Sequence, residues 1–64
     1  MVILNGKETA YGGGNLSELL KENGFRTDRI AVEYNGEILP KSEYDKTVLK
    51  DGDVLEVVSF VGGG

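Results

Sequence analysis

The sequence lacks both cysteine and histidine. Without cysteine, the chain cannot form a disulfide or a cysteine-based zinc site, so its stability must come from one packed core. Without histidine, it lacks the commonest general base and the commonest ligand of transition metals. Long hydrophobic runs are also missing, because Ser59 interrupts the apolar residues near the carboxyl end. We therefore expect neither a membrane-spanning segment nor a signal peptide.

The chain has 64 residues, which is enough for one small domain. A chain of this size buries only about 60% of its unfolded surface, which excludes an enzyme with its own enclosed substrate cavity. The formal net charge is −4, and the 7 basic residues are scattered along the sequence. Binding to nucleic acid or to an anionic membrane needs clustered positive charge, so neither is an expected partner. A cytoplasmic protein is the default expectation.

Two Asn-Gly pairs, Asn5-Gly6 and Asn35-Gly36, predict two β-hairpins, because a type I′ turn needs positive φ at both central residues. Pro40 follows the second hairpin, and its missing N–H group suits the edge of a sheet. The expected strands are residues 1–4, 7–11, 30–34, 37–39 and 54–61.

One amphipathic helix is predicted over residues 16–23, with its leucines on one stripe. Asn15 and Glu18 have the spacing of a capping box, and Gly24 suits the left-handed position that ends a helix. Two helical turns are not stable alone in water, so this helix must pack against the sheet.

Three shorter segments are interpreted as structural. Ser42 is expected to cap a single helical turn, and the carboxylates of Asp51 and Asp53 are explained by the turn around Gly52. The run 12–14 consists of three glycines but lacks the Lys-Ser/Thr ending of a phosphate-binding loop. It is therefore interpreted as a connector before the helix.

These elements predict an α+β fold in which one main helix packs across a mixed sheet of four to five strands. The most apolar strand, the last one, is expected near the centre of the sheet. The predicted core consists of Val2, Leu4, Leu16, Leu19, Leu20, Phe25, Ile30, Val32, Tyr34, Leu49, Leu55 and Val57.

The last strand is apolar on both sides. If Leu55 and Val57 point inward, then Val58 and Phe60 lie on the opposite side, where they predict a partner-binding surface together with Val61. The alternative is that Val58 and Phe60 complete the core.

Residues 1–61 are expected to form the domain, and Gly62, Gly63 and Gly64 a flexible tail. Residues without side chains can pass through a narrow channel, so the tail is expected to present the terminal carboxylate of Gly64 to another protein. The alternative is a frayed end without a function.

The sequence resembles the ThiS family of bacterial sulfur carriers, in the ubiquitin-like β-grasp superfamily. The resemblance covers essentially the whole chain. The least typical segment is Gly12 to Asn15, because such carriers more often place a threonine at the start of the helix. The matching stretches are residues 1–6 (MVILNG), 32–40 (VEYNGEILP), 49–58 (LKDGDVLEVV) and 60–64 (FVGGG).

The resemblance implies a β-grasp fold and a carrier rather than a catalyst. A ubiquitin-activating-type, ThiF-like adenylyltransferase would use ATP and Mg to adenylate Gly64, and a persulfide sulfur donor would displace AMP to leave a thiocarboxylate. A ThiG-like thiazole synthase would take this sulfur for the thiazole ring of thiamin. The chain itself would bind no cofactor and no metal, and Gly62 and Gly63 would provide passage through the channel.

Other members of the superfamily remain as alternatives. They are a MoaD-like carrier subunit for molybdopterin synthesis, a carrier for cysteine biosynthesis, and a protein-conjugating relative of ubiquitin. A different class is a plain β-grasp interaction module whose glycine tail has no role.

Overall fold

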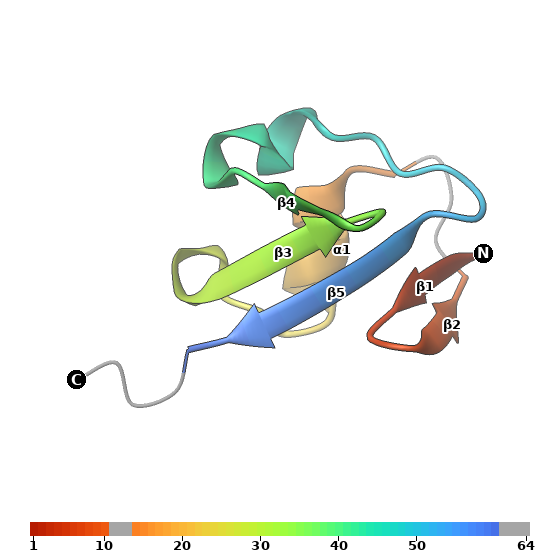
Figure 1. Cartoon of the computed structure of the whole chain (residues 1–64), viewed down its shortest axis with the longest axis horizontal. Helices are drawn as coiled ribbons and strands as arrows, with labels where there is room; N and C mark the ends of the chain where they lie inside the picture. The colour runs from red at the N-terminus through yellow and green to blue at the C-terminus, as the bar shows by residue number, and fades with distance from the viewer. Residues whose placement is uncertain (11–13, 61–64) are drawn as a thin grey trace.

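The computed structural model describes residues 1–10 and 14–60. They form a five-stranded sheet with the helix α1 (Leu16–Glu22) packed behind it (Figure 1). The strands are β1 (Val2–Leu4), β2 (Lys7–Thr9), β3 (Ile30–Tyr34), β4 (Glu37–Leu39) and β5 (Val54–Ser59). Two 3-10 helices accompany them, η1 (Thr27–Arg29) and η2 (Lys41–Lys46).

The last strand lies at the centre of the sheet, in the order β2-β1-β5-β3-β4. β5 pairs in parallel with β1 and antiparallel with β3, so the sheet is mixed. A central strand is shielded on both edges by its neighbours, which suits the most apolar segment of the chain. The predicted α+β class, the mixed sheet and the central last strand are confirmed, and the sheet has five strands.

Both Asn-Gly hairpins are confirmed. Asn5 and Asn35 have φ values of 50° and 51°, and the glycines that follow them have φ values of 83° and 88°. These left-handed conformations are the ones that a type I′ turn requires. The turns connect β1 to β2 and β3 to β4 as antiparallel pairs.

The two turn asparagines also bond to β5, which the turn signal alone does not predict. The side chain of Asn5 accepts a hydrogen bond from the amide of Val57 at 2.7 Å and donates one to its carbonyl at 3.2 Å. The side chain of Asn35 accepts from the amide of Val54 at 2.8 Å. Each hairpin turn therefore holds a different part of the central strand.

The predicted capping box of α1 is present. Asn15 is the N-cap, its side chain accepts from the amide of Ser17 at 2.8 Å, and Glu18 accepts from the amide of Asn15. The helix ends at Glu22, one residue earlier than predicted, because Asn23 is the C-cap.

The helix ends in the left-handed conformation that the sequence predicts at Gly24, whose φ is 81°. The amide of Gly24 donates to the carbonyl of Lys21, and the amide of Phe25 donates to that of Leu20 at 2.9 Å. This is the bonding pattern of a Schellman motif, which satisfies carbonyls at the helix end.

Several further boundaries differ from the sequence prediction, and β1 begins at Val2 rather than at residue 1. Ser42 does not cap η2, because this helix begins at Lys41 with Pro40 as its N-cap and no side-chain cap bond. The amide of Glu43 instead donates to the carbonyl of Pro40 at 2.9 Å. β2 ends at Thr9 rather than residue 11, and β5 ends at Ser59 rather than residue 61. Residues 11 and 61 themselves lie outside the described residues.

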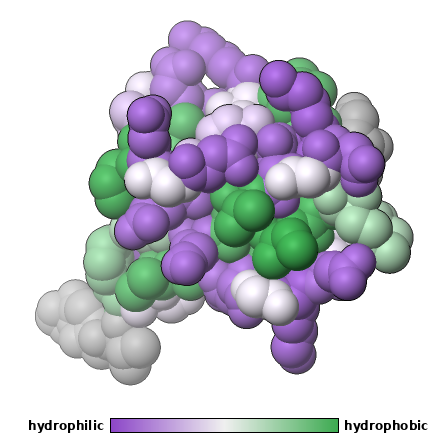
Figure 2. Space-filling view, turned by 45° about the vertical axis from the view of Figure 1, so that its right-hand side comes forward, coloured by the Kyte–Doolittle hydropathy of each residue, from purple (hydrophilic) through white to green (hydrophobic). Residues whose placement is uncertain are grey.

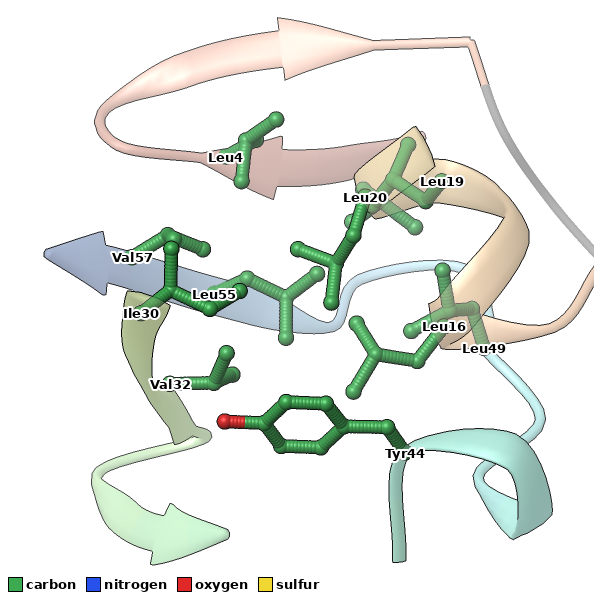
Figure 3. Close-up of a cluster of buried hydrophobic side chains, with 11 residues drawn as sticks. Leu4, Leu16, Leu19, Leu20, Ile30, Val32, Tyr44, Leu49, Leu55 and Val57 are labelled. Atoms are coloured by element: carbon green, nitrogen blue, oxygen red, sulfur yellow. The ribbon is translucent and has the colours of Figure 1, made fainter. Parts of the chain in front are cut away.

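The core lies between α1 and the sheet (Figure 3). Ten of the predicted core residues are buried, whereas Phe25 and Tyr34 are only partly buried and pack against the cluster. Tyr44, which the sequence prediction left out of the core, is 4% exposed and closes one side of it from η2. Burial raises the pKa of the Tyr44 hydroxyl, and a backbone hydrogen bond from Val32 opposes this shift. The buried set is Val2, Leu4, Leu16, Leu19, Leu20, Ile30, Val32, Tyr44, Leu49, Leu55 and Val57.

Candidate functional site

The sheet has one face against α1 and a second face, here called the outer face, that α1 does not cover (Figure 1). Side chains alternate between the two faces along a strand. In β5, Leu55 and Val57 point to the core, and Val54, Glu56 and Val58 point to the outer face. The predicted assignment of the two sides of the last strand is therefore confirmed.

Apolar residues from four strands meet on the outer face. Residues in register on neighbouring strands point to the same side, so the pairing of Val58 with Ala31 and of Val54 with Ile3 places all four there. Two of the side chains on this face are strongly exposed, Val58 at 61% and Ile38 at 70%. The apolar residues of the outer face are Ile3, Ala31, Ile38, Val54 and Val58.

The remaining strand positions of the outer face are acidic. They are Glu8, Glu33 and Glu56. None of the outward strand positions within the described residues is lysine or arginine. Figure 2 shows part of the surface, where apolar patches are bordered by hydrophilic side chains. The outer face is thus an apolar surface with negative charge, a composition suited to an interface with a basic partner.

Phe60 follows directly after β5 and is 57% exposed, so it does not complete the core. Its amide donates a hydrogen bond to the carbonyl of Arg29 at 2.8 Å, which fixes the backbone at the end of the central strand. The other predicted site residues, Val61, Gly62, Gly63 and Gly64, lie outside the described residues.

The turn before β5 contains the buried carboxylate of Asp53. This carboxylate accepts hydrogen bonds from the Tyr34 hydroxyl at 2.7 Å, the Lys50 amide at 2.8 Å and the Asn35 side chain at 3.2 Å. Burial raises the pKa of Asp53, but these donated bonds outweigh it and hold the pKa below its usual value. The hydrogen bond to Asp53 raises the pKa of Tyr34. Since the network joins β3, its turn and the start of β5, it has a structural role.

No group of three or more acidic residues that could hold a metal ion occurs in residues 1–10 and 14–60. Over the same residues, no helix is long and apolar enough to cross a membrane.

A family model described as the ThiS family matches residues 2–64. The chain belongs to the ThiS family. It is 39% identical over 66 residues to the sulfur carrier protein ThiS of Bacillus subtilis (strain 168), and the match covers 100% of both chains. The corresponding protein of Thermus thermophilus is 41% identical over 64 residues, again with 100% of both chains covered.

A solved structure supports the same ThiS fold. The crystal structure of the thiamine biosynthesis protein ThiS from Geobacter metallireducens superposes with a TM-score of 0.78 at 37% identity. It covers 98% of this chain and 97% of that one. The fold is therefore the ubiquitin-like β-grasp fold that the sequence resemblance implied.

The chain also matches a longer protein, a thiazole synthase of Paramagnetospirillum magneticum, at 44% identity over 64 residues. This match covers 98% of the chain but only 20% of the thiazole synthase. A second thiazole synthase, from Magnetococcus marinus, is matched over 19% of its length. The chain thus spans about a fifth of the length of these two relatives.

Sequence reasoning missed part of the outer face of this ThiS-family chain. It assigned a binding role to Val58, Phe60 and Val61. It assigned none to Ile38, Ala31 or Glu33. The signal was available in the two-residue alternation of each strand, but the strands had to be placed beside β5 before their outward residues could be combined.

Proposed function

We propose that this chain is a sulfur carrier for thiamin biosynthesis and that the terminal carboxylate of Gly64 carries the sulfur. The observation that supports the proposal most strongly is the alignment over the full length with two proteins named as ThiS sulfur carriers. The chain is then a carrier that other enzymes modify, and it catalyses no step itself. Its place is the cytoplasm, with the enzymes that load and unload it.

The proposed chemistry follows from the low reactivity of a carboxylate. Its oxygen is a poor leaving group, so an adenylyltransferase of the ubiquitin-activating type first transfers AMP from ATP to Gly64 and releases pyrophosphate. A persulfide sulfur then attacks the acyl carbon and displaces AMP. A thiol reduces the resulting acyl disulfide, which leaves the thiocarboxylate. The chain contains no cysteine, so the sulfur has to come from another protein.

The proposed consumer of the sulfur is a thiazole synthase. Two thiazole synthases contain a stretch of sequence similar to nearly the whole of this chain. A carrier that exchanges sulfur with such an enzyme needs to be held close to it, and joining the two in one polypeptide is one way to raise their effective concentration.

The experiment that tests the proposal is a reconstitution followed by intact-mass measurement. The purified chain is incubated with the ThiF-like adenylyltransferase of its own organism, ATP, Mg and a persulfide donor. Replacement of one carboxylate oxygen by sulfur raises the mass by about 16 Da, because a sulfur atom is about 16 Da heavier than an oxygen atom. A wild-type chain that forms an adenylate but never gains sulfur would contradict the proposal.

Gly64→Val is expected to abolish the mass gain, because a side chain at this position obstructs a narrow channel. Its thermal unfolding should match that of the wild type, since the core is formed by residues 2–57. Ala10→Val, an exposed position outside the strands, is the control and should gain sulfur normally. Normal sulfur loading of Gly64→Val would contradict the narrow channel, because the variant keeps a terminal carboxylate and adds only a side chain.

A further inference from the structure

Two carboxylates lie beside each other at the centre of the outer face. Glu33 of β3 and Glu56 of β5 are register partners in an antiparallel pair, so their side chains project on the same side of the sheet. Neither is involved in an ion pair or a side-chain hydrogen bond with any other described residue. Like charges placed directly opposite each other destabilise a sheet. The folded chain alone gains nothing from this arrangement.

The surroundings of the pair are apolar. Ile38 is the register partner of Glu33 on the other side, and Val58 and Ala31 form the next row along the same two strands. Solubility alone does not explain two glutamates in these positions, because a lysine opposite a glutamate would make the surface equally soluble. The paired carboxylates instead concentrate negative charge inside an exposed apolar patch. This pattern fits a cationic group that arrives with a partner.

We infer that Glu33 and Glu56 together receive one arginine or lysine side chain of a protein partner, whose apolar surface covers Val58 and Ile38. An arginine suits the position well, because its planar guanidinium group can donate to two carboxylates at once. The charge of the face supports a basic partner, since its outward strand positions include three glutamates and no basic residue. The net charge of −4 also favours a basic partner.

The partner is the adenylyltransferase of the proposed function, on which this inference rests. Glu56 and Val58 belong to the strand that leads toward Gly64. Gly64 lies four positions beyond Phe60 in the sequence, a span of about 14 Å when extended. An enzyme that binds the outer face therefore has the terminal carboxylate within reach of the same molecule. It is also the first enzyme that must recognise the carrier in its unmodified form.

The test compares two double variants that remove the same charge. Glu33→Gln/Glu56→Gln changes the pair, and Glu22→Gln/Glu37→Gln changes two exposed carboxylates that lie off the outer face. Binding of each purified variant to the adenylyltransferase is measured by calorimetry, and the melting temperature is measured in parallel. For the pair variant we expect affinity to fall about tenfold or more. Its melting temperature should rise by about 1–5 °C, because the repulsion is removed.

A loss of affinity with an unchanged or higher melting temperature supports the inference. Unchanged affinity overturns it, as does an equal loss in the control variant, which would indicate general charge attraction only. A clear fall in melting temperature would show that the carboxylates stabilise the fold and would also overturn it.

Self-association of the wild type that the pair variant abolishes would identify a second copy as the occupant. If the wild type gains sulfur while the pair variant binds normally, only this inference fails; if the wild type never gains sulfur, the proposed function fails.

Discussion

The two faces of β5 carry similar apolar side chains in opposite environments. Leu55 and Val57 are 0% and 7% exposed, whereas Val54 and Val58 on the outer face are 42% and 61% exposed. The difference follows from the two-residue period of a strand and from the position of α1 on one side only. It teaches that apolar character alone does not make a residue part of the core. The outer residues remain available to bind a partner.

The largest effect is expected on the inner face. Leu55→Ala should lower the free energy of unfolding by about 2–5 kcal/mol, because it leaves a cavity among fully buried side chains. Val58→Ala on the outer face is the comparison, and it should change the free energy of unfolding by about 0.5 kcal/mol or less. Urea denaturation followed by circular dichroism measures both. Similar losses for the two variants would mean that the two faces contribute equally to stability.

A second, smaller effect is expected at the beginning of β5. Asp53→Asn should destabilise the fold by about 1–3 kcal/mol, since the neutral amide cannot accept all three hydrogen bonds of the carboxylate. The pKa of Asp53 is lowered in the folded state, so its contribution is complete above the unfolded value of about 4. It is lost as the pH falls through the lower, folded-state pKa.

Unfolding experiments between pH 7 and pH 2 test this linkage. The wild type should lose stability as the pH drops below about 4, and Asp53→Asn should lose less over the same interval. Parallel curves for the two proteins would assign the acid sensitivity to other carboxylates.

The smallest effect on stability is expected on the outer face. Val58→Asp should change the melting temperature by only about 2 °C, because the side chain is already exposed. It should nevertheless weaken binding to the adenylyltransferase by about 2 kcal/mol, since it places a charge inside the apolar contact. Val48→Asp is the matched control, because Val48 is 58% exposed and lies outside the five strands. The two affinities are measured by calorimetry. Equal affinities would show that the outer face is not part of the interface with the adenylyltransferase.

Local signals in the sequence were sufficient for several elements. The Asn-Gly pairs predict both hairpins because the required positive φ depends on two adjacent residues. The capping box and Gly24 predict the limits of α1 to within one residue for the same reason. The apolar character of residues 54–58 was enough to place β5 at the centre of the sheet.

Contacts between distant parts of the chain were not predicted. Tyr44 belongs to the core although its short 3-10 helix has no hydrophobic period, so only the packing of η2 reveals its role. The bonds from Asn5 to Val57 join residues that are 52 positions apart. Glu33 and Glu56 become neighbours only through the register of β3 and β5. The prediction of Val58 and Phe60 as partner-binding residues used only their side of one strand, whereas the full outer face combines residues of five strands.

In the proposed function, the folded domain delivers the carboxylate of Gly64 for sulfur loading. The most direct measurement is peptide mapping of the chain after reconstitution with the adenylyltransferase, ATP and a persulfide donor. Cleavage after Lys50 releases the peptide 51–64, and tandem mass spectrometry locates the added mass within it. The account predicts that the whole gain of about 16 Da resides on Gly64, the acyl group that the sulfur nucleophile attacks. Sulfur on any other residue, or an unchanged peptide from a chain that the enzyme has adenylated, would contradict it.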